Sequence, residues 1–180
     1  MPNIVPAAML PHLPSAMTRI GVALRVEGPD DHAVARMLYG AARADELARV
    51  AWPSAMMTVF LDAQFAAQSA HYAANHPVAD RWIVTRLDVP VGRLYVDRSG
   101  ANWHLLDIVI AHEARGLGIG TALVTALIRA ARRVRTGITL QVARDNSRAE
   151  ALYRHLGFAE TPSESVTHKA MTHSGKARHR

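Results

Sequence analysis

The clearest candidate binding site in the chain is a short run of glycines beside an arginine. Residues 115–120 read Arg-Gly-Leu-Gly-Ile-Gly, between an apolar run at 105–110 and a helical pattern at 121–130. A glycine-rich turn that opens a helix presents free backbone N–H groups at the positive end of the helix dipole. Such a turn binds anions, most often phosphate. Arg115 adds positive charge, so the run predicts a phosphate site.

The spacing of the glycines excludes two common phosphate sites. The glycines fall at Gly116, Gly118 and Gly120, which is Gly-x-Gly-x-Gly and not the Gly-x-Gly-x-x-Gly of a dinucleotide site. The Gly-Lys-Ser/Thr ending of a Walker loop is absent. A glycine-rich turn without any ligand is the alternative, because short glycine patterns are weak signals by themselves.

A second segment identifies the kind of ligand. Residues 146–158 read Asn-Ser-Arg-Ala-Glu-Ala-Leu-Tyr-Arg-His-Leu-Gly-Phe. Together with residues 115–120, this segment strongly resembles the GNAT superfamily of N-acetyltransferases. The first run is similar to that family's pyrophosphate loop for acetyl-CoA, and the second to its Asn…Ala-x-x-Leu-Tyr-x-x-x-Gly-Phe helix. The resemblance covers roughly residues 81 to 160.

The resemblance implies a set of residues that contact acetyl-CoA as co-substrate. Loop amides and Arg115 would hold the pyrophosphate, main-chain groups of the strand at 108–110 would contact the acetyl and pantetheine groups, and Asn146 would contact the pantetheine. Asn146 also suits a helix N-cap without any ligand, and both roles are compatible. The full implied set is Ile108, Val109, Ile110, Arg115, Gly116, Leu117, Gly118, Ile119, Gly120, Thr121, Asn146 and Tyr153.

Acetyl transfer to an amine needs a neutral amine, a stabilised oxyanion and a proton for the leaving thiolate. By resemblance, Tyr153 lies near the thioester sulfur and is the candidate proton donor; the alternative is a core aromatic on an apolar helix stripe. Asp107 is the candidate general base, expected to share a strand face with Val109. His104 and Glu113 are other options for the base, and a solvated strand residue is the alternative reading of Asp107.

The pattern of apolar residues predicts the elements that position these groups. In the first half we expect a strand at 20–26, then helices at 31–50 (one helix or two, with a possible break at Gly40) and 53–75. An antiparallel meander of strands at 81–86, 91–96 and 103–110 should follow. The last part should form a helix at 117–135 ended by Gly137, a strand at 138–142, a helix opened by a Ser147–Glu150 capping box and closed by Gly157, and a final edge strand within 165–172. The resemblance implies an α/β fold of the α+β type: a GNAT-like mixed, mostly antiparallel sheet of six to seven strands, splayed between the fourth and fifth, with about four helices.

Length and charge suggest one domain with a basic end. At 180 residues we expect a single N-acetyltransferase domain over 19–165, a disordered leader at 1–18, and a basic tail at 166–180 that holds the edge strand and then becomes disordered. The net charge is +6, and Lys169, Lys176, Arg178 and Arg180 contribute much of it. Without interleaved aromatic residues, this tail is expected to be a solvated terminus and not a nucleic-acid-binding arm.

The composition also bounds the chemistry. The chain has no cysteine, which excludes disulfides and a cysteine acyl-enzyme and fits a cytoplasmic protein. No apolar run is long enough to predict a membrane span. The ten histidines form no recognisable ligand motif, so no metal is expected. Relatives are often monomers or homodimers.

The sequence therefore predicts an N-acetyltransferase that moves an acetyl group from acetyl-CoA to a primary amine by direct attack in a ternary complex. The acceptor is expected to be a small-molecule amine or amino acid, held by the first helices, where Gln64, Gln68, His71 and Tyr72 form a polar face. By itself, that face is more typical of an amphipathic surface helix without a ligand. One alternative is a protein N-terminal acetyltransferase of the ribosomal-protein type, with a peptide amine as acceptor. Another is a non-catalytic acyl-CoA-binding sensor module.

Overall fold

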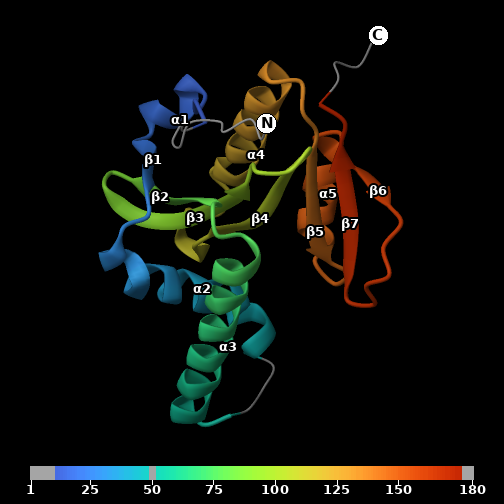
Figure 1. The fold of residues 1–180 in the computed structure, drawn as a ribbon. Coiled ribbons are helices and arrows are strands. Elements are labelled where there is room, and N and C mark those ends of the chain that lie inside the picture. Colours follow the sequence, from blue (N-terminus) through green and yellow to red (C-terminus); the bar gives the residue numbers. More distant parts are fainter. Residues whose placement is uncertain (1–10, 49–51, 176–180) are drawn as a thin grey trace.

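The chain folds around one mixed sheet with helices on both faces (Figure 1). The computed structural model describes residues 11–48 and 52–175. Seven strands lie in the order β1-β2-β3-β4-β5-β7-β6. The elements are α1 (Ser15–Arg19), β1 (Val22–Val26), a 3-10 turn η1 (Pro29–Asp31), α2 (His32–Leu47), α3 (Ser54–Asn75), β2 (Asp80–Arg86), β3 (Val89–Asp97), β4 (Trp103–Ile110), a second 3-10 turn η2 (His112–Ala114), α4 (Ile119–Arg133), β5 (Ile138–Ala143), α5 (Ser147–His155), β6 (Ala159–Thr161) and β7 (His168–His173).

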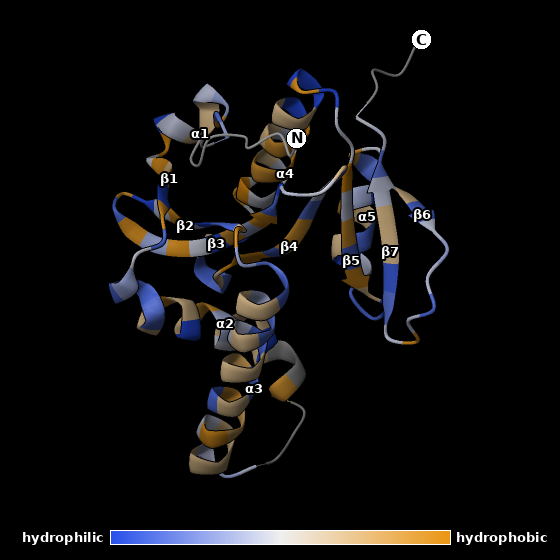
Figure 2. Cartoon of the chain, viewed as in Figure 1, coloured by the Kyte–Doolittle hydropathy of each residue, from blue (hydrophilic) through white to orange (hydrophobic). Residues whose placement is uncertain are grey.

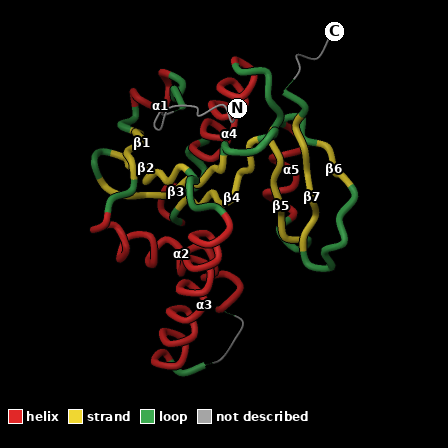
Figure 3. Tube along the Cα trace, in the orientation of Figure 1, coloured by secondary structure: helices red, strands yellow, loops and turns green. Residues whose placement is uncertain are grey.

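Strands β4 and β5 form the one parallel contact of the sheet and soon separate. Strands β1 to β4 pair antiparallel in sequence order. Strand β5 runs parallel to β4 and pairs with it only from Trp103–Ile138 to Leu105–Leu140. Beyond Leu105 the two strands diverge (Figure 3). The mostly antiparallel sheet and the splay between its fourth and fifth strands are therefore confirmed.

One face of the sheet carries the main apolar core. The buried residues of α4 recur at spacings of three and four, which is the stripe of an amphipathic helix packed on a sheet. Apolar residues mark β3, β4 and α4 in Figure 2. Leu94, Leu123, Leu127 and Tyr153 belong to this single buried cluster. The core holds α4 against β4, and so it fixes the turn that precedes the helix.

Helices α2 and α3 cover the other face of β3 and β4. Ala35, Tyr39 and Phe65 form a small buried cluster where the two helices meet. Phe65 is the buried residue of α3 among those described, and the N-terminal part of this long helix extends away from the sheet (Figure 1). This face is polar between the helices and the sheet, because Arg93 is buried there with an exposure of 1%.

Helix α2 runs through Gly40 without a break, which is the one-helix alternative for residues 31–50. The expected end of helix α4 is wrong. Helix α4 is capped by Val134, and Arg135 takes the left-handed conformation (φ 56°) that Gly137 was expected to supply. Gly137 is instead needed for a close approach: a Cβ there would lie 2.9 Å from the His173 carbonyl oxygen.

The last elements also differ from expectation. Helix α5 is capped by Asn146, whose side chain accepts a hydrogen bond from the Ala149 N–H, and not by Ser147. Strand β7 exists but lies between β5 and β6, so it is an interior strand and not the sheet edge. Part of the expected leader is ordered as α1, and Leu13, just before this helix, packs on the main core. The predictions for 1–10 and 176–180 lie outside the described residues.

Candidate active site

The glycine run forms an open turn at the N-terminus of α4. Gly116 and Gly118 have φ of 80° and 75°, a left-handed conformation that glycine adopts without strain. A Cβ at either position would meet nothing within 4 Å, so the space above the turn is free. The backbone N–H groups of residues 116–121 donate to no backbone carbonyl within the described part of the chain. Free amides at a helix N-terminus fit the pyrophosphate of acetyl-CoA.

Arg115 is placed at the base of this turn. Its Nε donates to the Ile110 carbonyl oxygen at 3.2 Å, and its Nη2 donates to that of Ala41 at 3.4 Å. The guanidinium therefore ties the turn to the end of β4 and to α2. The guanidinium contributes positive charge beside the loop, and the backbone N–H groups of the turn are the hydrogen-bond donors available to an anion.

A bulge in β4 marks the start of the splay. Tyr95 pairs with Asp107, but the next residue, Val96, pairs with Leu105, so Leu106 is an extra residue on β4. Past this point, the β5-facing edge of β4 has no partner strand among the described residues. The backbone groups at Ile108 to Ile110 are thus where the resemblance puts the acetyl and pantetheine contacts.

Asp107 forms a close ion pair with a buried arginine. Its Oδ2 lies 2.5 Å from Nη2 of Arg93, without the alignment of a hydrogen bond. Arg93 also donates to the Ala35 carbonyl oxygen at 3.1 Å and to Gln68 Oε1 at 2.8 Å. Asp107 faces the α2–α3 side, as does Val109, which packs with Leu38. The predicted shared face of Asp107 and Val109 is therefore confirmed.

Burial governs the ionisation of Asp107. Removal from water raises the pKa of its carboxyl above the ordinary value, although the charge and contact of Arg93 work in the opposite direction. A carboxyl with a raised pKa is a better proton acceptor than a solvated one. This environment suits a general base, and it equally describes a buried ion pair.

Tyr153 lies in the main core with its ring edge-to-face on Phe158, at 5.6 Å between centroids. Burial, and then the nearby charge of Asp107, raise the pKa of the Tyr153 hydroxyl to about 12. The phenol is therefore neutral at physiological pH. Its hydroxyl has no hydrogen-bond partner among the residues that the structure describes. Tyr153 is thus both a packing residue and a free proton donor.

The other candidate bases lie elsewhere. His104 is at the paired start of β4, where its Nδ1 is 2.8 Å from Thr139 Oγ1 and its ring stacks on His76. Burial, and then the charge of His76, lower its pKa. Glu113 is exposed in η2, close to the glycine turn. Asp107 is therefore the candidate base at the splay itself.

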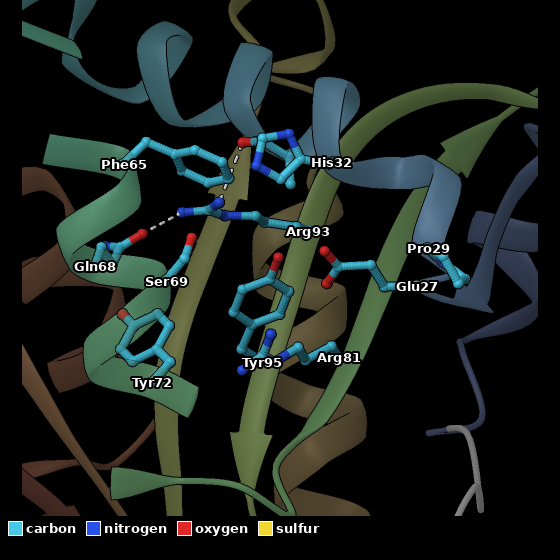
Figure 4. A pocket seen from close by; sticks show the side chains of 12 residues that line it. Glu27, Pro29, His32, Phe65, Gln68, Ser69, Tyr72, Arg81, Arg93 and Tyr95 are labelled. Carbon is cyan, nitrogen blue, oxygen red and sulfur yellow. Dashed lines mark hydrogen bonds between the residues drawn. The ribbon is translucent and has the colours of Figure 1, made fainter. Parts of the chain in front are cut away.

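A cavity of about 200 Å³ lies between the sheet and helices α2 and α3 (Figure 4). Two of its wall residues contact the β4 bulge directly. Tyr72 donates its hydroxyl to the Leu106 carbonyl oxygen at 3.2 Å, and Arg93 pairs with Asp107. Gln68 and Tyr72 were expected near an acceptor, whereas exposed Gln64 and His71 do not line this cavity. Sequence reasoning missed Glu27, Arg81 and Arg93, which belong to no motif.

The family model described as "Acetyltransferase (GNAT) family" matches residues 38–158. The chain belongs to this family. No curated protein matches the chain by sequence.

Solved GNAT-like structures share the fold at low identity. A PaiA N-acetyltransferase from Thermoplasma acidophilum, in complex with coenzyme A, is 12% identical with a TM-score of 0.67, over 85% of this chain and 98% of that one. An acetyltransferase from Thermus thermophilus is 16% identical with a TM-score of 0.63, over 84% and 96%. Ard1 from Thermoplasma volcanium is 18% identical with a TM-score of 0.58, over 86% and 97%.

Membership in the GNAT family makes acetyl-CoA-dependent acyl transfer the activity class of this protein. The residues present fit the co-substrate, because the turn before α4 offers unused amides and open space at Gly116 and Gly118. Within residues 11–48 and 52–175, no group of three metal-ligating side chains is found. No helix of the described chain is long and apolar enough to cross a membrane.

Proposed function

We propose that this protein transfers the acetyl group of acetyl-CoA to a primary amine by direct attack in a ternary complex. The observation that supports the proposal is the open turn before α4, where unused amides and free space fit a pyrophosphate. Asp107 on β4 and Tyr153 on α5 are the proposed base and acid, and the charge of Asp107 adds to burial in raising the pKa of Tyr153. The amide-lined turn of α4 follows directly from the same strand.

In the proposed reaction, the amine nitrogen forms a bond to the thioester carbonyl carbon, and the carbon–sulfur bond breaks. Asp107 accepts the proton that the amine loses, directly or through water. Tyr153 donates its hydroxyl proton to the departing thiolate. Backbone N–H groups at the β4 bulge would stabilise the developing oxyanion. Because the chain has no cysteine, a cysteine acyl-enzyme is not available.

The proposed acceptor is a small-molecule amine or an amino acid. The cavity beside the β4 bulge, at about 200 Å³, is smaller than typical sites for drug-sized ligands and has charged walls. A protein N-terminal acetyltransferase is the second candidate, because a peptide N-terminus also carries a primary amine. A non-catalytic acyl-CoA sensor would not need the unpartnered Tyr153 hydroxyl.

Calorimetric titration with acetyl-CoA, and with free CoA in parallel, tests the proposal. Saturable binding in the micromolar range is expected, followed by turnover with small amines and amino acids. Absence of binding at millimolar acetyl-CoA would refute the enzyme proposal. Turnover of peptide N-termini alone would favour the second candidate, and binding without any turnover would favour a sensor.

A further inference from the structure

The cavity between the sheet and helices α2 and α3 holds two opposite charges that do not pair (Figure 4). Glu27 Oε2 is buried and has no hydrogen-bond partner. Arg81 makes neither an ion pair nor a hydrogen bond with its side chain among the described residues, and its guanidinium lies over the Tyr95 ring at 5.6 Å. Burial, and then the contact with the Glu27 carboxylate, raise the pKa of the Tyr95 hydroxyl against the opposing charge of Arg93. This phenol therefore stays neutral, so it contacts the Glu27 carboxylate without cancelling its charge. The Nε of Arg93, another wall residue, is also buried without a partner.

These unsatisfied groups indicate a ligand. Buried polar atoms nearly always have a hydrogen-bond partner, and leaving one without a partner costs about 1–3 kcal/mol or more for a charged group. Glu27 Oε2 is such a buried atom, and half-buried Arg81 presents an opposite charge to the same cavity. A ligand that carries both an anionic and a cationic group would satisfy Glu27 and Arg81 together.

The register of the sheet relates this cavity to the β4 bulge. The Glu27 N–H donates to the Arg81 carbonyl oxygen at 3.0 Å, Arg81 pairs with Tyr95, and Tyr95 pairs with Asp107. These residues form one row across neighbouring strands. Because strands lie about 4.8 Å apart, Arg81 and Asp107 are about 10 Å apart along the row. Tyr72 and Tyr95 pack edge-to-face beside it and offer an apolar wall.

We propose that this cavity is the acceptor subsite and that it binds the α-carboxylate and α-ammonium of an amino acid whose side-chain amine is acetylated. Arg81 binds the carboxylate and Glu27 binds the ammonium. The aliphatic side chain runs along the row past Tyr95, and its terminal amine points toward Asp107, the partner of the wall residue Arg93. Lysine and ornithine have this chemistry. This inference rests on the proposed acetyltransferase function, and it names the substrate class.

The alternatives fit the walls less well. A diamine of the same length lacks the carboxylate that would satisfy Arg81. A protein N-terminus carries one amine and no free carboxylate beside it. Arg93 is already neutralised by Asp107, so Arg81 and Glu27 are the charges left for a ligand.

Ligand binding by the full chain without acetyl-CoA tests the inference. Calorimetry with L-lysine and cadaverine, and with L-ornithine and putrescine, compares each amino acid with its decarboxylated counterpart. We expect each amino acid to bind at least about tenfold more tightly than its diamine, as charged hydrogen bonds require. Equal affinity for an amino acid and its diamine would overturn the inference. Absence of binding by both lysine and ornithine at millimolar concentration would also overturn it.

Variants locate the site. Arg81→Gln and Glu27→Gln should each weaken lysine binding at least about tenfold. The matched controls Arg19→Gln and Glu164→Gln, at exposed positions, should leave lysine binding unchanged. Coenzyme A affinity and the melting temperature of each variant show whether the fold is retained. Unchanged lysine binding by Arg81→Gln would place the ligand elsewhere.

The acetylated product separates the inference from the proposed function. With lysine as acceptor, mass fragmentation should show the acetyl group on the side-chain nitrogen; acetylation of the α-nitrogen would overturn the orientation. If other amines are acetylated while lysine neither binds nor reacts, the inference fails and the function stands. If lysine binds but acetyl-CoA does not, the proposed function fails, and with it the acceptor role of the cavity.

Discussion

Burial, and not only position, decides how the candidate catalytic residues ionise. Asp107 and Tyr153 are both removed from water, and in both cases this raises the pKa. For Tyr153 the raised pKa keeps the proton on the phenol, as an acid needs. For Asp107 it increases basicity, while the ion pair with Arg93 keeps the carboxylate form accessible. The two residues therefore have opposite roles in the proposed reaction.

Replacement of Tyr153 by phenylalanine tests the acid. Tyr153→Phe keeps the ring that packs on Phe158 and removes only the hydroxyl. We expect kcat to fall about 100-fold, the lower range for general acid catalysis, with acetyl-CoA affinity nearly unchanged. Steady-state kinetics and calorimetry check this. Unchanged turnover would make Tyr153 a packing residue alone.

The pH dependence of the rate tests the base. Activity should rise with pH through the pKa of Asp107, which lies above the ordinary carboxyl range, because the ionised form accepts the proton. Asp107→Asn should lose this rising limb of the pH–rate profile and lower kcat by roughly 100-fold or more. Coenzyme A binding serves as the control for folding. A variant that keeps both the limb and the rate would exclude Asp107 as the base.

At the scale of elements, the N-terminus of α4 has the geometry that the glycine motif predicts. The helix is anchored by its buried apolar stripe, while the turn before it is open to solvent and leaves its amides unused. The core thus fixes the helix and leaves its first turn free for an anion. Helix α5 is anchored in the core by its buried residue Tyr153, and the Asn146 side chain caps its N-terminus.

A carboxylate placed in the turn should repel the pyrophosphate. Gly120 is the best position, because it has no positive φ and a Cβ there has its nearest neighbour, Ile110 Cγ1, at 4.0 Å. We expect Gly120→Glu to weaken acetyl-CoA binding roughly 100-fold through like-charge repulsion, without loss of the fold, since an acidic residue suits a helix N-terminus. Ala101→Glu, in an exposed turn, is the charge-matched control. Equal affinity of both variants would exclude the turn as the pyrophosphate site.

At the scale of the whole molecule, the sheet separates two kinds of packing. An apolar core under α4 supplies most of the buried hydrophobic residues. The opposite face, under α2 and α3, buries charge at Arg93 and Asp107. A bidentate ion pair from Arg25 to Asp31, with both contacts at 2.6 Å, ties β1 to the entry of α2. This contact holds the rim of the cavity that contains Glu27.

The Asp31 contact should make stability depend on pH. Hydrogen bonds from Arg25 and from the Gly28 N–H lower the pKa of Asp31 to about 2. A lowered pKa means that the stabilisation is present at neutral pH and is lost as pH falls from about 4 toward 2. Because Arg25 is 46% exposed, solvent screening reduces the expected contribution to about 1 kcal/mol.

Denaturant unfolding of Asp31→Asn checks this effect. The free energy of unfolding at pH 7 should fall by about 1 kcal/mol relative to the parent protein, and the difference should shrink toward pH 2. Asp30→Asn, at the exposed neighbouring position, is the control and should change little. A difference that does not vary with pH would assign the loss to packing.

Local patterns were sufficient for most elements and for the turn proposed to hold the co-substrate. The boundaries of β4, the length of α3 and the turn at 115–120 follow from short-range rules, since apolar period and glycine conformation are properties of neighbouring residues. The GNAT family, and with it the splayed sheet, could be predicted because the two motifs of the resemblance, at 115–120 and 146–158, are contiguous in the sequence. The wrong predictions concern features that depend on residues distant in sequence. The role of Gly137 depends on the His173 backbone, and the position of β7 inside the sheet depends on its pairing with β5 and β6.

The acceptor side depended on tertiary structure alone. Glu27, Arg81, Tyr95 and Asp107 come from four strands or strand ends, and only the pairing of those strands brings them into one row. The ionisation of Tyr95 and Asp107 also depends on burial beneath α2 and α3, which no single segment encodes. The chain's local chemistry thus specifies which co-substrate it binds, whereas the packing of distant segments decides which charges stay unpaired and what acceptor they can bind.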